Sequence, residues 1–140
     1  MAKLILGLDL GTTSVKCSII DSQSCQILSQ QNQDTHAGEG EQNVMEIINA
    51  VQKCLHLLPK EQLQRVQRIG VCGQMHGVVL WKAQTTERWT PELAGLKEDD
   101  VSPLFTWQDD KCTKDFLDTL PKPDSHLRYN IIHIYFTSAS

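Results

Sequence analysis

The sequence predicts an α/β domain with a mixed sheet, in which an antiparallel meander is followed by a helix and one more strand. Three short apolar segments, at residues 4–10, 15–20 and 25–29, are separated by turn-forming residues, which is typical of strands joined by tight turns. Apolar residues then recur every three or four positions between residues 44 and 58, the pattern of an amphipathic helix. A fourth apolar segment, 66–73, completes a β-β-β-α-β order.

Each of these elements has a local reason to begin and end where it does. The first strand stops at residues 11–14, which are rich in turn and hydrogen-bonding side chains, and the second stops at the polar residues 21–24. Loop signals at 34–40 precede the helix, and Pro59 ends it. The β-branched residues Val66, Ile69 and Val71 predict a largely buried fourth strand that ends at Gly73.

The second half of the chain has weaker signals. Residues 78–82 predict a short strand, and residues 85–100, which mix Pro, Gly and acidic residues without periodicity, predict a surface insertion. After the apolar residues 104–107, either Asp109 or Asp110 can cap a short helix before Pro121. The apolar face of that helix would consist of Phe116, Leu117 and Leu120.

Composition limits the class of partner. The chain has 140 residues, 40% of them hydrophobic, and a net charge of −4, so a single globular domain is expected, without the positive surface that binds nucleic acid or an anionic membrane. It lacks an apolar run of the roughly 18 residues that span a membrane, and it does not begin like a signal peptide, so we expect a cytoplasmic protein. The five cysteines have neither disulfide nor zinc spacing, which favours free thiols.

The first candidate site is the turn after the first strand. It differs from a Walker P-loop, but Gly11 lets the backbone turn consecutive amides toward an anion, and Lys16 adds positive charge. Asp9 can hold a hydrated magnesium ion, since Mg²⁺ keeps several waters and takes one or two carboxylates. Hydroxyl donors come from Thr12, Thr13 and Ser14. The alternative is a plain hairpin turn in which Asp9 and the threonines satisfy local backbone groups.

The second candidate site follows the fourth strand, between Gly73 and Gly77. Gln74, Met75 and His76 can project into a cleft there, where an amide and an imidazole suit sugar hydroxyls because each can hydrogen-bond them. The alternative is that His76 is a structural histidine and Met75 fills the core.

The third candidate is the segment Thr106-Trp107-Gln108-Asp109. The indole of Trp107 can stack on the C–H face of a sugar while neighbouring polar groups, including Asp109, bind its hydroxyls. The alternative is a core tryptophan followed by a helix cap.

Together the three segments resemble a known family. The start Gly-Leu-Asp-Leu-Gly-Thr-Thr-Ser-Val-Lys is similar to the first phosphate motif of the superfamily that contains actin, heat-shock ATPases and sugar kinases. Gly-Gln-Met-His-Gly and Trp-Gln-Asp narrow the resemblance to the FGGY carbohydrate kinases, and within them to the kinases of the ketose sedoheptulose. The resemblance covers about residues 4–127 and implies an actin-like, ribonuclease-H-like α/β fold.

The resemblance also implies an activity, cofactors and site residues. The activity is the transfer of phosphate from ATP, with Mg²⁺, to sedoheptulose. The residues matching the phosphate motif, namely Gly11, Thr12, Thr13, Ser14 and Lys16, would meet the nucleotide phosphates, and Asp9 would lie near Mg²⁺. The sugar would contact Gln74, Met75, His76, Trp107 and Asp109.

The chain also departs from the family pattern. Members are several times longer, and the aspartate that serves as their general base lies beyond the part matched here, so no catalytic residue is assigned. We therefore expect residues 1–127 to form part of the kinase N-terminal domain and 128–140 to be a divergent tail of a truncated form. Such a chain is expected to be inactive by itself and to self-associate; the alternative function is a non-catalytic chain with weak sugar or phosphate binding.

Overall fold

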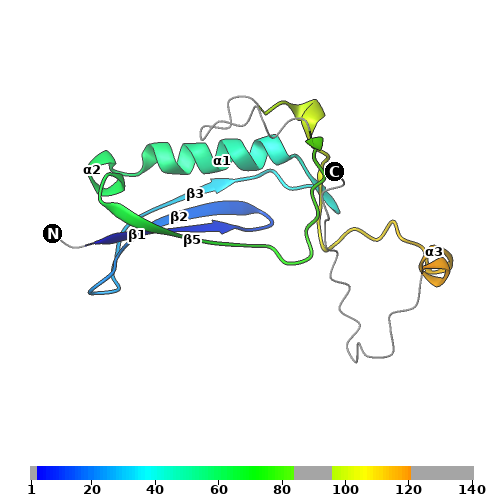
Figure 1. Ribbon diagram of the computed structural model, residues 1–140, viewed down its shortest axis with the longest axis horizontal. Helices are drawn as coiled ribbons and strands as arrows, with labels where there is room; N and C mark the ends of the chain where they lie inside the picture. The colour runs from blue at the N-terminus through cyan, green and yellow to red at the C-terminus, as the bar shows by residue number, and fades with distance from the viewer. Residues whose placement is uncertain (1–2, 84–95, 121–140) are drawn as a thin grey trace. The chain divides into compact units, whose positions relative to one another are not determined.

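The main sheet has four strands in the order β3-β2-β1-β5, in a computed structural model that describes residues 3–83 and 96–120. β1 (Leu4–Leu10), β2 (Ser14–Asp21) and β3 (Ile27–Asp34) form an antiparallel meander, and β5 (Val66–Gly73) lies parallel to β1. Figure 1 shows β5 at one edge of the sheet and the long helix α1 over one face. The predicted mixed α/β sheet with its β-β-β-α-β order is confirmed.

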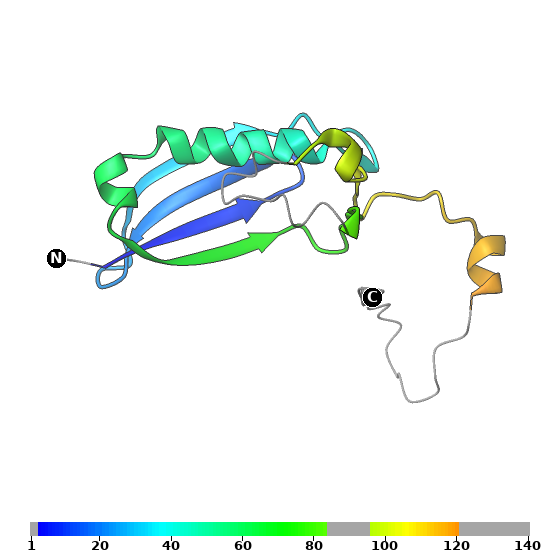
Figure 2. The ribbon, with the colours of Figure 1, turned by 45° about the horizontal axis from the view of Figure 1, so that its top comes forward.

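α1 (Val44–Leu57) covers the sheet mainly at β2 and β3 (Figure 2). The side chain of Asn43 caps it by accepting a hydrogen bond from the amide of Met45 at 2.8 Å. α2 (Lys60–Leu63) follows Pro59 and leads into β5. The buried apolar side chains come from β1, β2, α1 and the residue after α1: Leu4, Leu6, Val15, Cys17, Ile19, Ala50, Cys54 and Leu58. Burial raises the pKa of Cys17 to about 12, and all five cysteines are free thiols.

A second, two-stranded sheet pairs β4 (Glu41–Gln42) with β6 (Leu104–Phe105) in antiparallel fashion. Val78 joins it through reciprocal hydrogen bonds of 2.9 Å with Phe105, and a short 3-10 helix, η2 (Glu98–Asp100), precedes β6. Residues 110 onward form a separate unit containing α3 (Lys114–Thr119). The parts of the chain described contain no helix long and apolar enough to cross a bilayer.

The strand predicted at residues 66–73 exists as β5, but the prediction that it is largely buried is wrong. Its side chains at Ile69 and Val71 are 62% and 64% accessible. The physical reason is topological: β5 is an edge strand, and α1 packs over β2 and β3 on the other side of β1.

The ends of three other predicted elements also differ. β3 begins at Ile27 and runs to Asp34, because Cys25 adopts a left-handed φ of 57° inside the turn and the polar residues 30–34 pair with β2. Thr113, not Asp109 or Asp110, caps α3. The predicted strand at 78–82 consists only of isolated bridges at Val78 and Trp81. Most of the predicted insertion and the whole 128–140 tail lie outside the described residues.

Candidate functional site

The candidate site lies where the parallel strands β1 and β5 end. Leu10 and Gly73 are register partners, so the two strands end together, and the Gln74 amide donates to the Leu10 carbonyl at 3.1 Å. The turn after β1 and the segment after β5 therefore begin at one edge of the sheet. In open α/β sheets, the carboxyl ends of the strands are where ligands bind.

The turn between β1 and β2 holds its shape through glycine. The Gly11 amide donates to the Ser14 carbonyl at 3.0 Å, and a Cβ on Gly11 would lie 2.9 Å from that same oxygen. Position 11 therefore requires glycine because the Ser14 carbonyl approaches it so closely. The sequence predicted conformational freedom as the reason, but Gly11 does not adopt a left-handed φ.

The same turn leaves two consecutive amides available. Among the residues that the structure describes, the Thr12 and Thr13 amides donate to no backbone or side-chain acceptor. Consecutive amides at a turn form a concavity that binds anions. The turn can thus accept a phosphate without first breaking a backbone hydrogen bond of its own.

Asp9 contacts side chains rather than local backbone amides. Its Oδ2 lies 3.9 Å from Nζ of Lys16, its register partner on β2, and its Oδ1 lies 3.6 Å from Sγ of Cys72. Both Asp9 and Lys16 are about half exposed. Within 3–83 and 96–120 no cluster of three or more His, Cys, Asp or Glu gathers. A half-exposed carboxylate such as that of Asp9 is compatible with hydrated Mg²⁺, which takes one or two carboxylates and keeps several waters.

The segment after β5 presents the side chains of Met75 and His76 to solvent. Met75 is 76% exposed, so it does not fill the core, and His76 is exposed with a left-handed φ of 60°. A non-glycine residue in that region costs about 1–3 kcal/mol, and such strain clusters at ligand sites. A Cβ on Gly77 would lie 3.0 Å from Cδ1 of Leu104, so glycine there allows the segment to approach β6 closely.

The third segment follows β6, and it does not match the alternative of a core tryptophan followed by a helix cap. Thr106 is buried; its amide donates to the Gly40 carbonyl at 2.9 Å and its Oγ1 accepts from the Gln108 amide at 3.2 Å. Trp107 is 59% exposed and is therefore not a core residue. Asp109 packs beside Gly40, where a Cβ would lie at an ordinary contact distance of 3.6 Å from Asp109 Cα, so glycine is favoured there by its φ of 75°.

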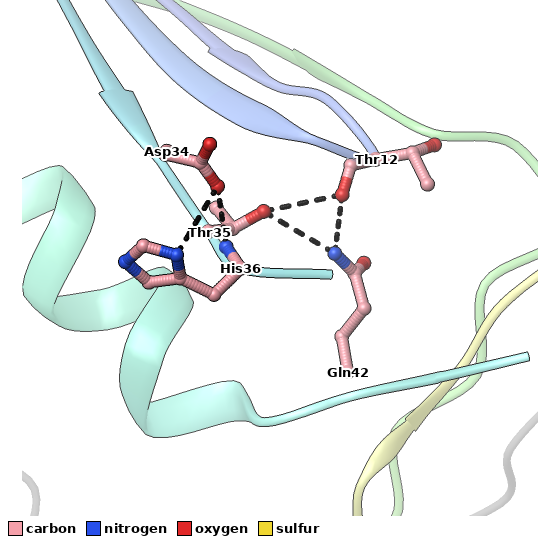
Figure 3. A network of polar contacts seen from close by, with 5 residues as sticks. All are labelled: Thr12, Asp34, Thr35, His36 and Gln42. Carbon is pink, nitrogen blue, oxygen red and sulfur yellow. Dashed lines mark hydrogen bonds and ion pairs between the residues drawn. The ribbon is translucent and has the colours of Figure 1, made fainter. Parts of the chain in front are cut away.

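Sequence reasoning missed two buried polar residues that join these segments, Gln42 and Thr35. Nε2 of Gln42 donates to the Thr12 carbonyl and, at 3.3 Å, to Oγ1 of Thr35, while Oγ1 of Thr35 donates to the Thr12 carbonyl at 3.1 Å (Figure 3). Oε1 of Gln42 accepts from Nε2 of Gln74 at 2.6 Å, and Oε1 of Gln74 accepts from Oγ1 of Thr12 at 3.3 Å. No periodicity marks either residue, because both lie in polar stretches that read as loop.

Comparison with known proteins places the chain in a family. Residues 4–92 match the N-terminal domain of the FGGY family of carbohydrate kinases. The chain belongs to this family. The predicted membership is therefore confirmed, and with it the N-terminal part of an actin-like α/β domain as the fold.

Relatives within the FGGY family include two sedoheptulokinases. That of Mus musculus is 44% identical over 139 residues, which cover 87% of this chain and 29% of the relative. That of Homo sapiens is 39% identical over 142 residues, covering 89% and 30%. A solved xyloylose kinase from Brucella ovis superposes with a TM-score of 0.59 and 27% identity over 77% of this chain and 21% of its own. The chain thus spans about three tenths of the curated relatives.

Proposed function

We propose that this chain forms the nucleotide-phosphate turn and one wall of the sugar site of a kinase that transfers phosphate from ATP to sedoheptulose, giving sedoheptulose 7-phosphate. The observation that carries the proposal is that the phosphate-motif turn and the sugar segment begin together at the carboxyl ends of β1 and β5, while Val78, just after the sugar segment, pairs with Phe105, just before the third segment. The choice of sugar is supported by the identity to the mouse and human sedoheptulokinases. We also propose that the protein acts in the cytoplasm and feeds the pentose phosphate route.

The nucleotide half of the site would bind phosphate through backbone amides and charged side chains. The Thr12 and Thr13 amides, with Ser14 and Lys16, would bind phosphate oxygens, and Asp9 would hold hydrated Mg²⁺ at the half-exposed end of β1. When bound, Mg-ATP supplies the phosphoryl group and neutralises part of its charge. Phosphoryl transfer depends largely on such positioning and charge stabilisation.

The sugar half of the site would use side chains after β5 and β6. The exposed ones are His76, which can hydrogen-bond hydroxyls, and Met75 and Trp107, which offer apolar surface to C–H groups. Gln74 and Asp109 are half-buried and would contribute the hydrogen-bonding capacity that their amide and carboxylate have left. No residue of this chain is assigned as the general base that receives the proton of the attacking hydroxyl, because the family resemblance places that aspartate outside the matched part of the relatives.

A second candidate function is a non-catalytic chain with at most weak sugar or phosphate binding. It is favoured by the edge position of β5, where Ile69 and Val71 are exposed and no further strand pairs within residues 3–83 and 96–120. Exposed apolar edge strands pair with other molecules. We expect the purified 140-residue chain to phosphorylate no sugar and to self-associate with rising concentration; a monodisperse monomer or sugar phosphorylation would contradict this.

The kinase proposal is tested with a chimera. In it, the matched residues of this chain replace the corresponding N-terminal part of mouse sedoheptulokinase. We expect the folded chimera to phosphorylate sedoheptulose in preference to xylulose. A folded chimera with activity only on another sugar would refute the substrate, and a folded chimera with no kinase activity, beside an active mouse parent, would refute the function.

A further inference from the structure

Gln42 is the residue that joins the phosphate turn to the sugar segment. Its side chain contacts Thr12 of the phosphate turn and Gln74 of the sugar segment, and its backbone pairs with Leu104, two residues before Thr106. It is 3% exposed, and its partner Thr35 is 1% exposed. The contact between Gln42 and Thr35 is therefore buried, while the contacts of Gln42 with Thr12 and Gln74 are partly buried.

The Thr12 carbonyl, which can only accept hydrogen bonds, fixes the orientations of the side-chain amides of Gln42 and Gln74. The Thr12 carbonyl has no proton to donate, so Gln42 must turn its NH₂ group toward it and its oxygen toward Gln74. Gln74 must then present its own NH₂ group to Gln42, which leaves its oxygen facing the Thr12 hydroxyl.

The Thr12 hydroxyl consequently has one proton and two potential acceptors. In this structure the proton is directed at Oε1 of Gln74 at 3.3 Å. A phosphate bound at the Thr12 and Thr13 amides would compete for that proton. If the hydroxyl turned to the phosphate, Gln74 would lose a hydrogen bond, one residue before Met75 and two before His76.

We propose that Gln42 is a positioning residue that couples the phosphate turn to the sugar segment, by holding Gln74 so that the two sites share the Thr12 hydroxyl proton. The coupling rests on the proposed function, whereas the positioning of Gln74 does not. Neither requires Gln42 to touch a ligand.

The positioning is tested without ligand, by NMR of the ¹⁵N-labelled 140-residue chain at concentrations where it is monomeric. Gln42→Met should make the side-chain NH₂ of Gln74 exchange with solvent about tenfold faster, because its buried acceptor is lost. The matched control is Gln62→Met, which removes a comparable bond to Ser29 (2.6 Å) elsewhere and should leave Gln74 unchanged. Unaltered Gln74 exchange in Gln42→Met would overturn the positioning.

The coupling is tested by adding Mg-ATP to the same chain. We expect the Gln74 side-chain signals to move together with the Thr12 and Thr13 amides in the wild type and in Thr12→Ser. In Thr12→Val, which lacks the shared proton, the turn amides should still respond while Gln74 does not.

Two results of this experiment would contradict different parts of the proposal. An equal response of Gln74 in Thr12→Val would overturn the coupling, even if Gln42→Met failed to fold. No movement of the Thr12 and Thr13 amides would count against the proposed function and the coupling, while the ligand-free exchange would still decide the positioning of Gln74.

Discussion

The two turns of the meander both carry hydroxyl side chains near an aspartate, but their backbone amides and carbonyls are hydrogen-bonded differently. In the turn between β2 and β3, every amide from Ser22 to Gln26 has an acceptor. Oδ1 of Asp21 takes two of them, from Gln23 at 2.8 Å and Ser24 at 3.1 Å. These donors lower the pKa of Asp21.

In the turn between β1 and β2, the carbonyls are the groups held in place. Thr12 O accepts from Gln42 and Thr35, and Thr13 O accepts from the Thr35 amide at 3.0 Å, while the Thr12 and Thr13 amides have no acceptor among the described residues. Asp9, just before this turn, faces Lys16 and Cys72 instead. The aspartate at the first turn position accepts from the amides of the turn between β2 and β3, whereas the turn between β1 and β2 leaves two amides without an acceptor among the described residues.

The largest expected difference is between the two aspartates in the chimera. Asp9→Asn should lower kcat at least about a hundredfold, because an amide of the same shape lacks the charge that holds Mg²⁺. Asp21→Asn should leave kcat within a factor of about two, since surface changes away from a site have small effects. Both are measured by steady-state kinetics, with thermal melting to show that Asp9→Asn folds. Near-normal turnover in folded Asp9→Asn would remove Asp9 from the site.

The next largest effect concerns the sugar side. His76→Ala in the chimera should raise KM for sedoheptulose about 5- to 150-fold and leave KM for ATP nearly unchanged, as expected for a hydrogen bond of about 1–3 kcal/mol that the bound sugar buries against His76. The matched control is His36→Ala, since His36 is also exposed with a left-handed φ, of 48°. If the melting temperature falls in His76→Ala while the sugar KM stays constant, His76 is structural.

The smallest expected effect is on the pH dependence of the melting temperature, through Asp21 at the turn between β2 and β3. Because the folded pKa of Asp21 lies below its ordinary value of 3.8, its carboxylate stabilises the fold above about pH 4, and this is lost as the pH falls through the folded pKa. The wild-type chain should melt above Asp21→Asn at pH 6, and the gap should narrow below pH 3.8. An equal gap at both pH values would show that charge on Asp21 is irrelevant.

The sequence was sufficient to predict the helices and strands that are marked by local patterns of residues. The meander, the helix after residue 43 and the strand at 66–73 follow from periodicity and turn residues, and the three motif segments were found as contiguous strings. The exposure of Ile69 and Val71 was not predictable in this way, because their apolar character indicates a strand but not whether it lies at the centre or the edge of a sheet.

The network around Gln42 could not be predicted for a different reason. Gln42 lies 30 residues from Thr12 and 32 from Gln74, and pairing between distant polar side chains leaves no period in the sequence. The contrast between the two turns has the same origin. Both contain Ser or Thr near an aspartate, and only the fold shows which aspartate faces its own amides.

The most direct measurement of the central claim is amide hydrogen exchange of the chimera, followed by mass spectrometry with and without Mg-ATP. We predict that Mg-ATP slows exchange in peptides that contain residues 11–14 and leaves peptides that contain residues 22–26 unchanged. Unchanged exchange at residues 11–14 while Mg-ATP is bound, or equal slowing in both turns, would contradict the assignment of the first turn as the phosphate site.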